Sequence, residues 1–209
     1  MKLQNLVPLA LVALAGLTLG SGCPTIPKVE DRIVEMALGA STTLEFQAEG
    51  ILNTYDDVGI EDLAVDFDLN KALDDAGIDV SDLKDIKLAG VSYRVTVPDP
   101  NAGRAISNAT VTARRGAGVE TALVTNFNQN VDAVTGWTTA PLDPAGVTLI
   151  NGLLTDMVTA AKNHTAVPNS AISYHVHGTS TSTDATTTFT WQLRVDLTII
   201  GTIKVKVLD

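Results

Sequence analysis

Two histidines separated by one residue, His175 and His177, have the spacing in this sequence that best suits metal chemistry. Residues two apart on a β-strand point to the same face, so both imidazoles can reach one ion. His164, the remaining histidine, would supply the third ligand that a zinc hydrolase needs if it lies nearby. The alternative is that Tyr174 and Val176 face inward, which would leave both histidines on a solvated surface.

The acidic segment Asp66-x-Asp68-x-Asn70 has the spacing of the first half of a calcium-binding loop. The match then fails, because Lys71 stands where that loop needs glycine and Gly77 stands where it needs a bidentate glutamate. A wider acidic cluster could still hold calcium, although a solvated acidic face is the favoured explanation. Its further members are Asp56, Asp57, Asp74 and Asp75.

Trp137 follows Gly136 in a threonine-rich segment, where an exposed indole could bind a glycan or a protein partner. The alternative is that Trp137 covers an edge of the hydrophobic core. The sequence contains no G-x-S-x-G nucleophile motif, and its glycine pair near Arg114 and Arg115 is not followed by the helix start that a phosphate loop requires. We therefore expect no catalytic residue and no cofactor.

Cys23 is the only cysteine of the 209 residues, and it follows an apolar run from Leu6 to Leu19. That run of about 14 residues is shorter than the roughly 20 residues that cross a bilayer as a helix. Together with Lys2 it has the organisation of a secretory signal peptide. Small residues at 20–22 then lead directly into Cys23.

This segment resembles the lipobox of bacterial lipoprotein signals, in which a leucine and two small residues precede a cysteine. The resemblance implies that Cys23 is acylated and that residues 1–22 are removed. Gly20 departs from the pattern because leucine usually occupies that position, and cleavage by an ordinary signal peptidase is the alternative. Pro24 follows the cysteine instead of the aspartate that often marks retention at the inner membrane, which favours the outer membrane or the cell surface.

Charge and length restrict the function further. The chain has 14 Lys and Arg against 24 Asp and Glu, and loss of Lys2 with the signal leaves a net charge of −11. Such an acidic protein is soluble and is not expected to bind nucleic acid or anionic headgroups. The sequence predicts a signal peptide at 1–22, a lipidated cysteine and tether at 23–40, with a short helix over 29–38, and one domain at 41–209.

Alternation of apolar and polar residues predicts the strands of that domain. The clearest stretch is 188–207, where odd positions are apolar, with a bend or bulge expected at Ile200-Gly201. Other strands are expected over 43–49, 62–70, 91–97, 109–114, 120–128 and 172–177. A short helical turn is expected from Lys71, ending at Gly77.

One longer helix is expected at 144–163. Asp143 suits the N-cap position, Pro144 suits the first helical position, and apolar residues then recur at helical spacing. The fold class expected from these elements is mostly β: an antiparallel β-sandwich of about eight strands with one amphipathic helix. The stretch from Gly77 to Leu88 and the strand after it also resemble part of a group of uncharacterised β-sandwich surface lipoproteins, which implies a fold and a location but no activity.

Three functions are compatible with this sequence. The first is a non-catalytic, membrane-anchored envelope lipoprotein that acts as a binding or structural module for an envelope protein or a glycan. The second is a carrier of a lipid or other apolar ligand, which a buried apolar cavity above about 300 Å³ would indicate. The third is a metal-dependent hydrolase at His175 and His177, which three converging nitrogens would indicate.

Overall fold

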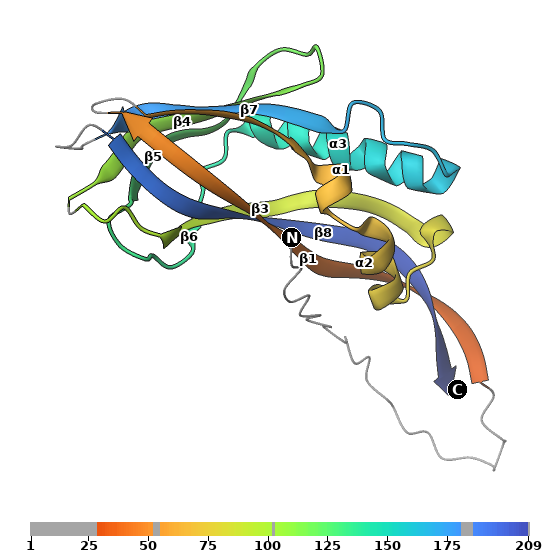
Figure 1. Ribbon diagram of the computed structural model, residues 1–209. Coiled ribbons are helices and arrows are strands. Elements are labelled where there is room, and N and C mark those ends of the chain that lie inside the picture. The colour runs from red at the N-terminus through yellow and green to blue at the C-terminus, as the bar shows by residue number, and fades with distance from the viewer. Residues whose placement is uncertain (1–28, 52–54, 102, 181–185, 209) are drawn as a thin grey trace.

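The computed structural model describes residues 29–51, 55–101, 103–180 and 186–208 (Figure 1). Within these ranges the chain forms two antiparallel four-stranded sheets, ordered β1-β8-β3-β6 and β2-β7-β4-β5. The strands are β1 (Val29–Ile51), β2 (Tyr55–Asp62), β3 (Leu83–Val97), β4 (Ala105–Arg115), β5 (Thr121–Asn130), β6 (Thr138–Thr139), β7 (Ala171–Ser180) and β8 (Thr186–Leu208). The predicted mostly β sandwich of about eight strands is confirmed.

Strands β1 and β8 are the longest elements and run side by side across the molecule (Figure 1). They pair without interruption from Val29 opposite Leu208 to Ile51 opposite Thr186. An irregularity does lie at the predicted Ile200-Gly201 position, but its extra residue is in β3: Leu83 pairs with Gly201 and Asp85 with Ile200, while β8 stays in register with β1. Gly201 is required for another reason: a Cβ atom there would lie 2.8 Å from Cγ2 of Ile78.

The tether predicted up to residue 40 and the short helix predicted over 29–38 are wrong, because residues 29–40 form the first half of β1. Residues 29–40 are strand, held by backbone pairing with the last residues of β8, which lie far away in the sequence. This part of β1 leaves large apolar side chains such as Ile33 and Val34 exposed. The expected tether residues before 29, together with Cys23 and the signal peptide, lie outside the described residues.

The predicted strand over 62–70 is also wrong, because this stretch forms α1 (Leu63–Asp66) and the start of α2 (Leu69–Ala76). The polar residues of the alternation are helix caps. Asp62 accepts a hydrogen bond from the Ala64 amide at 3.1 Å, and Asp68 accepts one from the Lys71 amide at 2.9 Å. The helical turn predicted to end at Gly77 is confirmed, since Gly77 adopts the left-handed conformation at the C-cap of α2.

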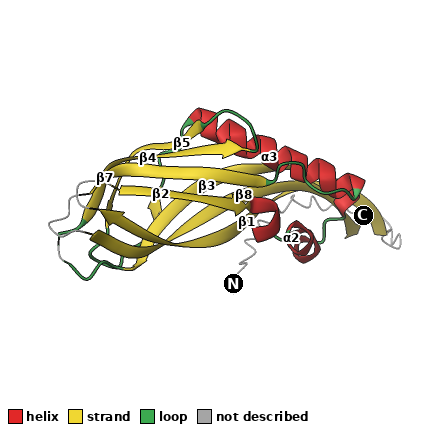
Figure 2. Cartoon of the chain, turned by 45° about the horizontal axis from the view of Figure 1, so that its top comes forward, coloured by secondary structure: helices red, strands yellow, loops and turns green. Residues whose placement is uncertain are grey.

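The helix predicted at 144–163 is confirmed as α3 (Pro144–Asn163), which lies along one side of the sandwich in Figure 2. The Asp143 side chain accepts a hydrogen bond from the Ala145 amide at 2.9 Å, and Pro144 occupies the first turn. His164 ends the helix in a left-handed conformation. The helix packs on β3 and β5.

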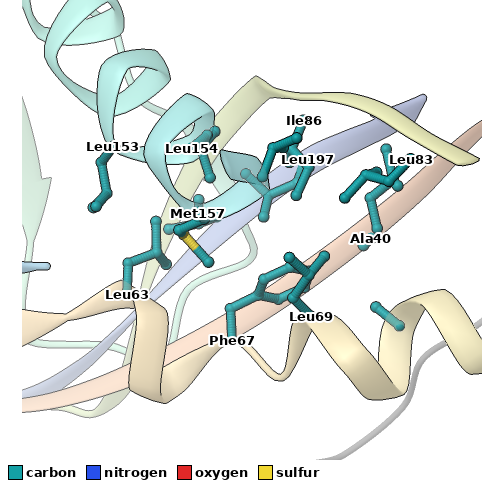
Figure 3. Packing of buried hydrophobic residues seen from close by; sticks show 14 of the residues in the cluster. Ala40, Leu63, Phe67, Leu69, Leu83, Ile86, Leu153, Leu154, Met157 and Leu197 are labelled. Atoms are coloured by element: carbon teal, nitrogen blue, oxygen red, sulfur yellow. The ribbon is translucent and has the colours of Figure 1, made fainter. Parts of the chain in front are cut away.

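The largest hydrophobic cluster lies between α3, the helical segment 63–76 and the sheet that contains β8 (Figure 3). Leu153 and Leu154 of α3 are fully buried in it and lie beside Met157. A separate cluster fills the other end of the sandwich, around Val95 and Ile106. Val124 of β5 also forms an isolated bridge with Leu142, which lies just before α3. The space between these clusters contains the site described below.

Candidate functional site

The two histidines of the predicted metal pair lie together on the outer face of β7. Their ring centroids are 5.4 Å apart, with His175 half-buried and His177 exposed. Val176 between them is buried, as the alternation predicts. The pair is therefore on the solvent-facing side of the sheet, where both rings could in principle reach one ion.

His164 does not join this pair in a metal-binding group. It caps the C-terminus of α3 and is exposed. Across the ranges that the structure describes, no three residues of the types His, Cys, Asp and Glu are grouped so that they could hold a metal ion. Metal binding by His175 and His177 stays a prediction from their spacing.

The acidic residues of the expected calcium site are engaged locally. Asp68 caps α2, and Asp75 forms an ion pair with Lys71 at 2.6 Å on the surface of that helix. The side chains of Asp56 and Asp57 lie outside the described residues. The Asp66-x-Asp68-x-Asn70 segment, which resembles half a calcium loop, therefore spans the end of α1 and the start of α2.

Trp137 packs against the outer face of the β8-β3-β6 part of its sheet. Two guanidinium groups contact its indole, with the Arg94 Cζ atom 4.5 Å and the Arg194 Cζ atom 4.8 Å from the ring centroid. Arg94 is itself held by two hydrogen bonds to Oε1 of Gln192, at 3.1 and 2.9 Å. The half-buried indole thus makes two cation–π contacts within the protein. Binding of a glycan or partner by Trp137 stays a prediction.

The site with the clearest capacity to bind is a cavity of about 150 Å³ between the two sheets. All of its lining residues but one, Glu61, are apolar or aromatic. Both sheets and the first turns of α3 contribute to the lining, which includes Leu44, Leu88, Val91, Val111, Val124, Ala140, Leu142, Gly146, Ile150, Ile172, Val176, Leu193 and Val195. A space of this kind favours an apolar ligand over water, because water would find too few hydrogen-bonding partners.

Aromatic rings form a large part of the cavity wall. Four of the nine aromatic residues of the chain line it: Tyr93, Phe127, Tyr174 and Trp191. Tyr93 and Phe127 meet edge to face, with centroids 5.6 Å apart. The Tyr174 ring crosses over β2 at Gly59, where a Cβ atom would lie only 2.4 Å from the Tyr174 hydroxyl oxygen. Glycine at position 59 is therefore what allows this ring to close the cavity wall.

Glu61 is the acidic residue of the cavity wall. It lies directly opposite Ile172 in the β2–β7 pair, and residues directly opposite one another share a face of the sheet. Since Ile172 is buried, the Glu61 side chain is directed to the interior side, where it is half-buried. Burial raises the pKa of the Glu61 carboxyl, and the neighbouring Asp66 carboxylate raises it further.

Strand β2 explains why the sequence analysis missed this residue. In an ordinary half-buried strand the apolar side chains face the core. In β2 they face solvent, since Val58 and Ile60 are each 69% exposed. Gly59 and Glu61 occupy the inward positions. The signal was present as a short Val-Gly-Ile-Glu alternation, but its inward face can be assigned only from the pairing with β7.

The described part of the chain includes no helix long and apolar enough to cross a membrane. Cys23, whose acylation would supply an anchor, precedes the described residues. Fold and cavity together define a β-sandwich with an internal apolar site closed by a helix.

Comparisons with known proteins do not assign this chain to a family. No protein-family profile matches the sequence, and no curated protein matches it. A solved structure described as Desmodium yellow mottle tymovirus aligns with 97% of this chain and 97% of its own, at 10% sequence identity and a TM-score of 0.24. A likeness at that score carries no conclusion about fold or function.

Proposed function

We propose that this protein is a non-catalytic, lipid-anchored binding protein of the bacterial cell envelope that holds a small apolar ligand between its sheets. The observation that carries the proposal is the apolar cavity of about 150 Å³. A cavity of about this volume, lined by similar side chains, stays dry and accepts benzene or xenon. It is half the roughly 300 Å³ at which drug-sized ligand sites begin, so the expected ligand is one ring or a short chain rather than a whole lipid.

Export and anchoring rest on the N-terminal sequence. The apolar run before Cys23, the small residues at 20–22 and the absence of any other cysteine support acylation at this position. Pro24 favours delivery to the outer membrane or the cell surface. The ligand would then be one that reaches the protein at the envelope.

Replacing Cys23 with alanine should release the protein from membranes, because acyl chains bind a bilayer by about 0.8 kcal/mol per buried methylene. The measurement is the distribution of the full chain between membrane and soluble fractions, together with its intact mass. Ser21→Ala keeps a small residue and serves as the matched control, which should stay in the membrane fraction. Unchanged mass and partitioning in Cys23→Ala would show that Cys23 is not acylated.

A small apolar compound should stabilise the folded protein by binding in the cavity. At a free ethylbenzene concentration ten times its Kd, the free energy of unfolding should rise by about 1.4 kcal/mol. The measurement is the unfolding midpoint of the full chain in lipid nanodiscs, with empty nanodiscs used to correct for ligand that partitions into lipid. Xenon under pressure provides a second probe of the same cavity.

Ala140→Leu is the matched control for this measurement, because Ala140 lines the cavity and a larger side chain there occupies its volume. The stabilisation by ethylbenzene and xenon should then be lost. If neither compound shifts the midpoint of the natural protein, the cavity binds no small apolar ligand and the proposed function is wrong. A shift that persists in Ala140→Leu would place binding elsewhere and would overturn it equally.

A further inference from the structure

The cavity combines two features that an apolar hydrocarbon alone does not use. The first is its four aromatic rings, contributed by β3, β5, β7 and β8. The faces of aromatic rings carry partial negative charge and attract cations, most strongly where water is excluded. Rings that surround a small space therefore suit a ligand that carries positive charge as well as apolar surface.

The second feature is the Glu61 carboxylate. None of the ion pairs among the described residues involves Glu61. Its charged neighbour is Asp66 of α1, another acid, which makes the ionised form of Glu61 less favourable. A half-buried carboxylate at an apolar cavity is costly without an opposite charge, and a cationic ligand would supply one.

We propose that the natural ligand of this cavity is a small amine, with a body of one ring or a short chain among the aromatic residues and an ammonium group at the Glu61 carboxylate. This inference rests on the proposed function, since it names the chemical class that the same cavity takes. An anionic ligand is disfavoured because Glu61 and Asp66 would both repel it. A purely apolar ligand fits the volume but leaves the carboxylate beside it without a counter-charge.

Three probes of similar size test this proposal in the full chain: ethylbenzene, 2-phenylethylamine and phenylacetate. We expect the amine to bind more tightly than phenylacetate by tenfold or more at pH 8. In Glu61→Gln, which keeps the size and shape of the side chain, the affinity for the amine should fall by about tenfold or more, as expected for a lost charged hydrogen bond. The affinity for ethylbenzene should change less than about threefold, because the apolar contacts remain.

The pH dependence is a second readout that a structural role of Glu61 would not produce. Amine binding needs the ionised carboxylate, so it should strengthen as the pH rises through the raised pKa of Glu61. Glu61→Gln should remove this rise. Without ligand the sign is opposite: the raised pKa means that Glu61 contributes stability below its unfolded-state pKa and loses it as the pH rises through the folded-state pKa.

The outcomes separate the two proposals. Ethylbenzene binding together with an amine affinity that Glu61→Gln does not change would overturn the amine inference and leave the apolar binding function intact. Amine binding that persists in the cavity-filled Ala140→Leu variant would place the amine elsewhere and would also overturn the inference. Failure of all three probes to bind would overturn the proposed function itself.

Discussion

Replacing Asp99 with alanine should lower the free energy of unfolding by about 3–5 kcal/mol, because it removes one partner of a buried ion pair. Asp99 and Arg104 flank the turn between β3 and β4, and both side chains are almost wholly buried. The Arg104 Nε atom lies 3.6 Å from Oδ1 of Asp99. The pair lies where the sandwich is closed by loops rather than by helices.

The Asp99 carboxylate also holds backbone groups from two parts of the chain. Its Oδ1 atom accepts a hydrogen bond from the Asn101 amide at 2.7 Å, and Oδ2 accepts one from the Thr188 amide at 2.8 Å. Val131 extends the connection to β5, since its amide donates to the Arg104 carbonyl and its carbonyl accepts from the Asp99 amide. Loss of the carboxylate would remove both of these hydrogen bonds together with the contact to Arg104.

Chemical denaturation of Asp99→Ala, Arg104→Met and the double variant measures this coupling. The double variant should be more stable than Asp99→Ala, because it removes the buried positive charge of the pair together with the negative one. Glu35→Gln is the control, since the Glu35–Lys84 pair is exposed and surface pairs contribute little. Equal losses in Asp99→Ala and the control would show that the buried pair does not stabilise the fold.

Elements set by local chemistry could be predicted from the sequence. Helix α3 has an aspartate cap, a proline in its first turn and apolar residues at helical spacing, and all of these act within a few residues. Strand β8 alternates so regularly that its inward positions, including Val195, Leu197 and Ile199, are buried as expected. In both cases the amphipathic pattern is long enough to exclude other periods.

Elements that depend on distant partners could not be predicted. The stretch from Leu63 to Leu69 alternates like a strand, yet it forms α1 and the start of α2, and its apolar residues pack under α3 (Figure 3). The first half of β1 becomes strand only because the end of β8 pairs with it. Propensity over a short window cannot decide such cases, since tertiary contacts override it.

The candidate site could be predicted from the sequence only in part. His175 and His177 were identified from their spacing alone, and the structure places them together on one face. The cavity gave no local signal, because a cavity is a property of how two sheets face one another, and the alternation that contains Glu61 is too short to show which of its faces is inward. The inverted face of β2 can be assigned only once Glu61 is seen opposite Ile172.

Two glycines of α3 should respond to the same substitution with opposite signs. A Cβ atom at Gly146 would lie 2.6 Å from Cα of Leu123 and 2.7 Å from the Ala122 carbonyl oxygen. Both contacts are with the backbone of β5, so the helix or the strand must move to accommodate Gly146→Ala. We expect a loss of about 1–3 kcal/mol in the free energy of unfolding, as for other overpacked sites.

Gly152 lies two turns further along α3, and a Cβ atom there would meet nothing within 4 Å. Gly152→Ala should therefore raise the free energy of unfolding, by up to about 1 kcal/mol, because alanine loses less conformational entropy than glycine in a helix. Denaturant unfolding of the two variants side by side measures the difference. Stabilisation by both substitutions would mean that α3 does not pack closely on β5. Because Gly146 also lines the cavity, the same result would mean that α3 does not form part of the wall that confines the ligand.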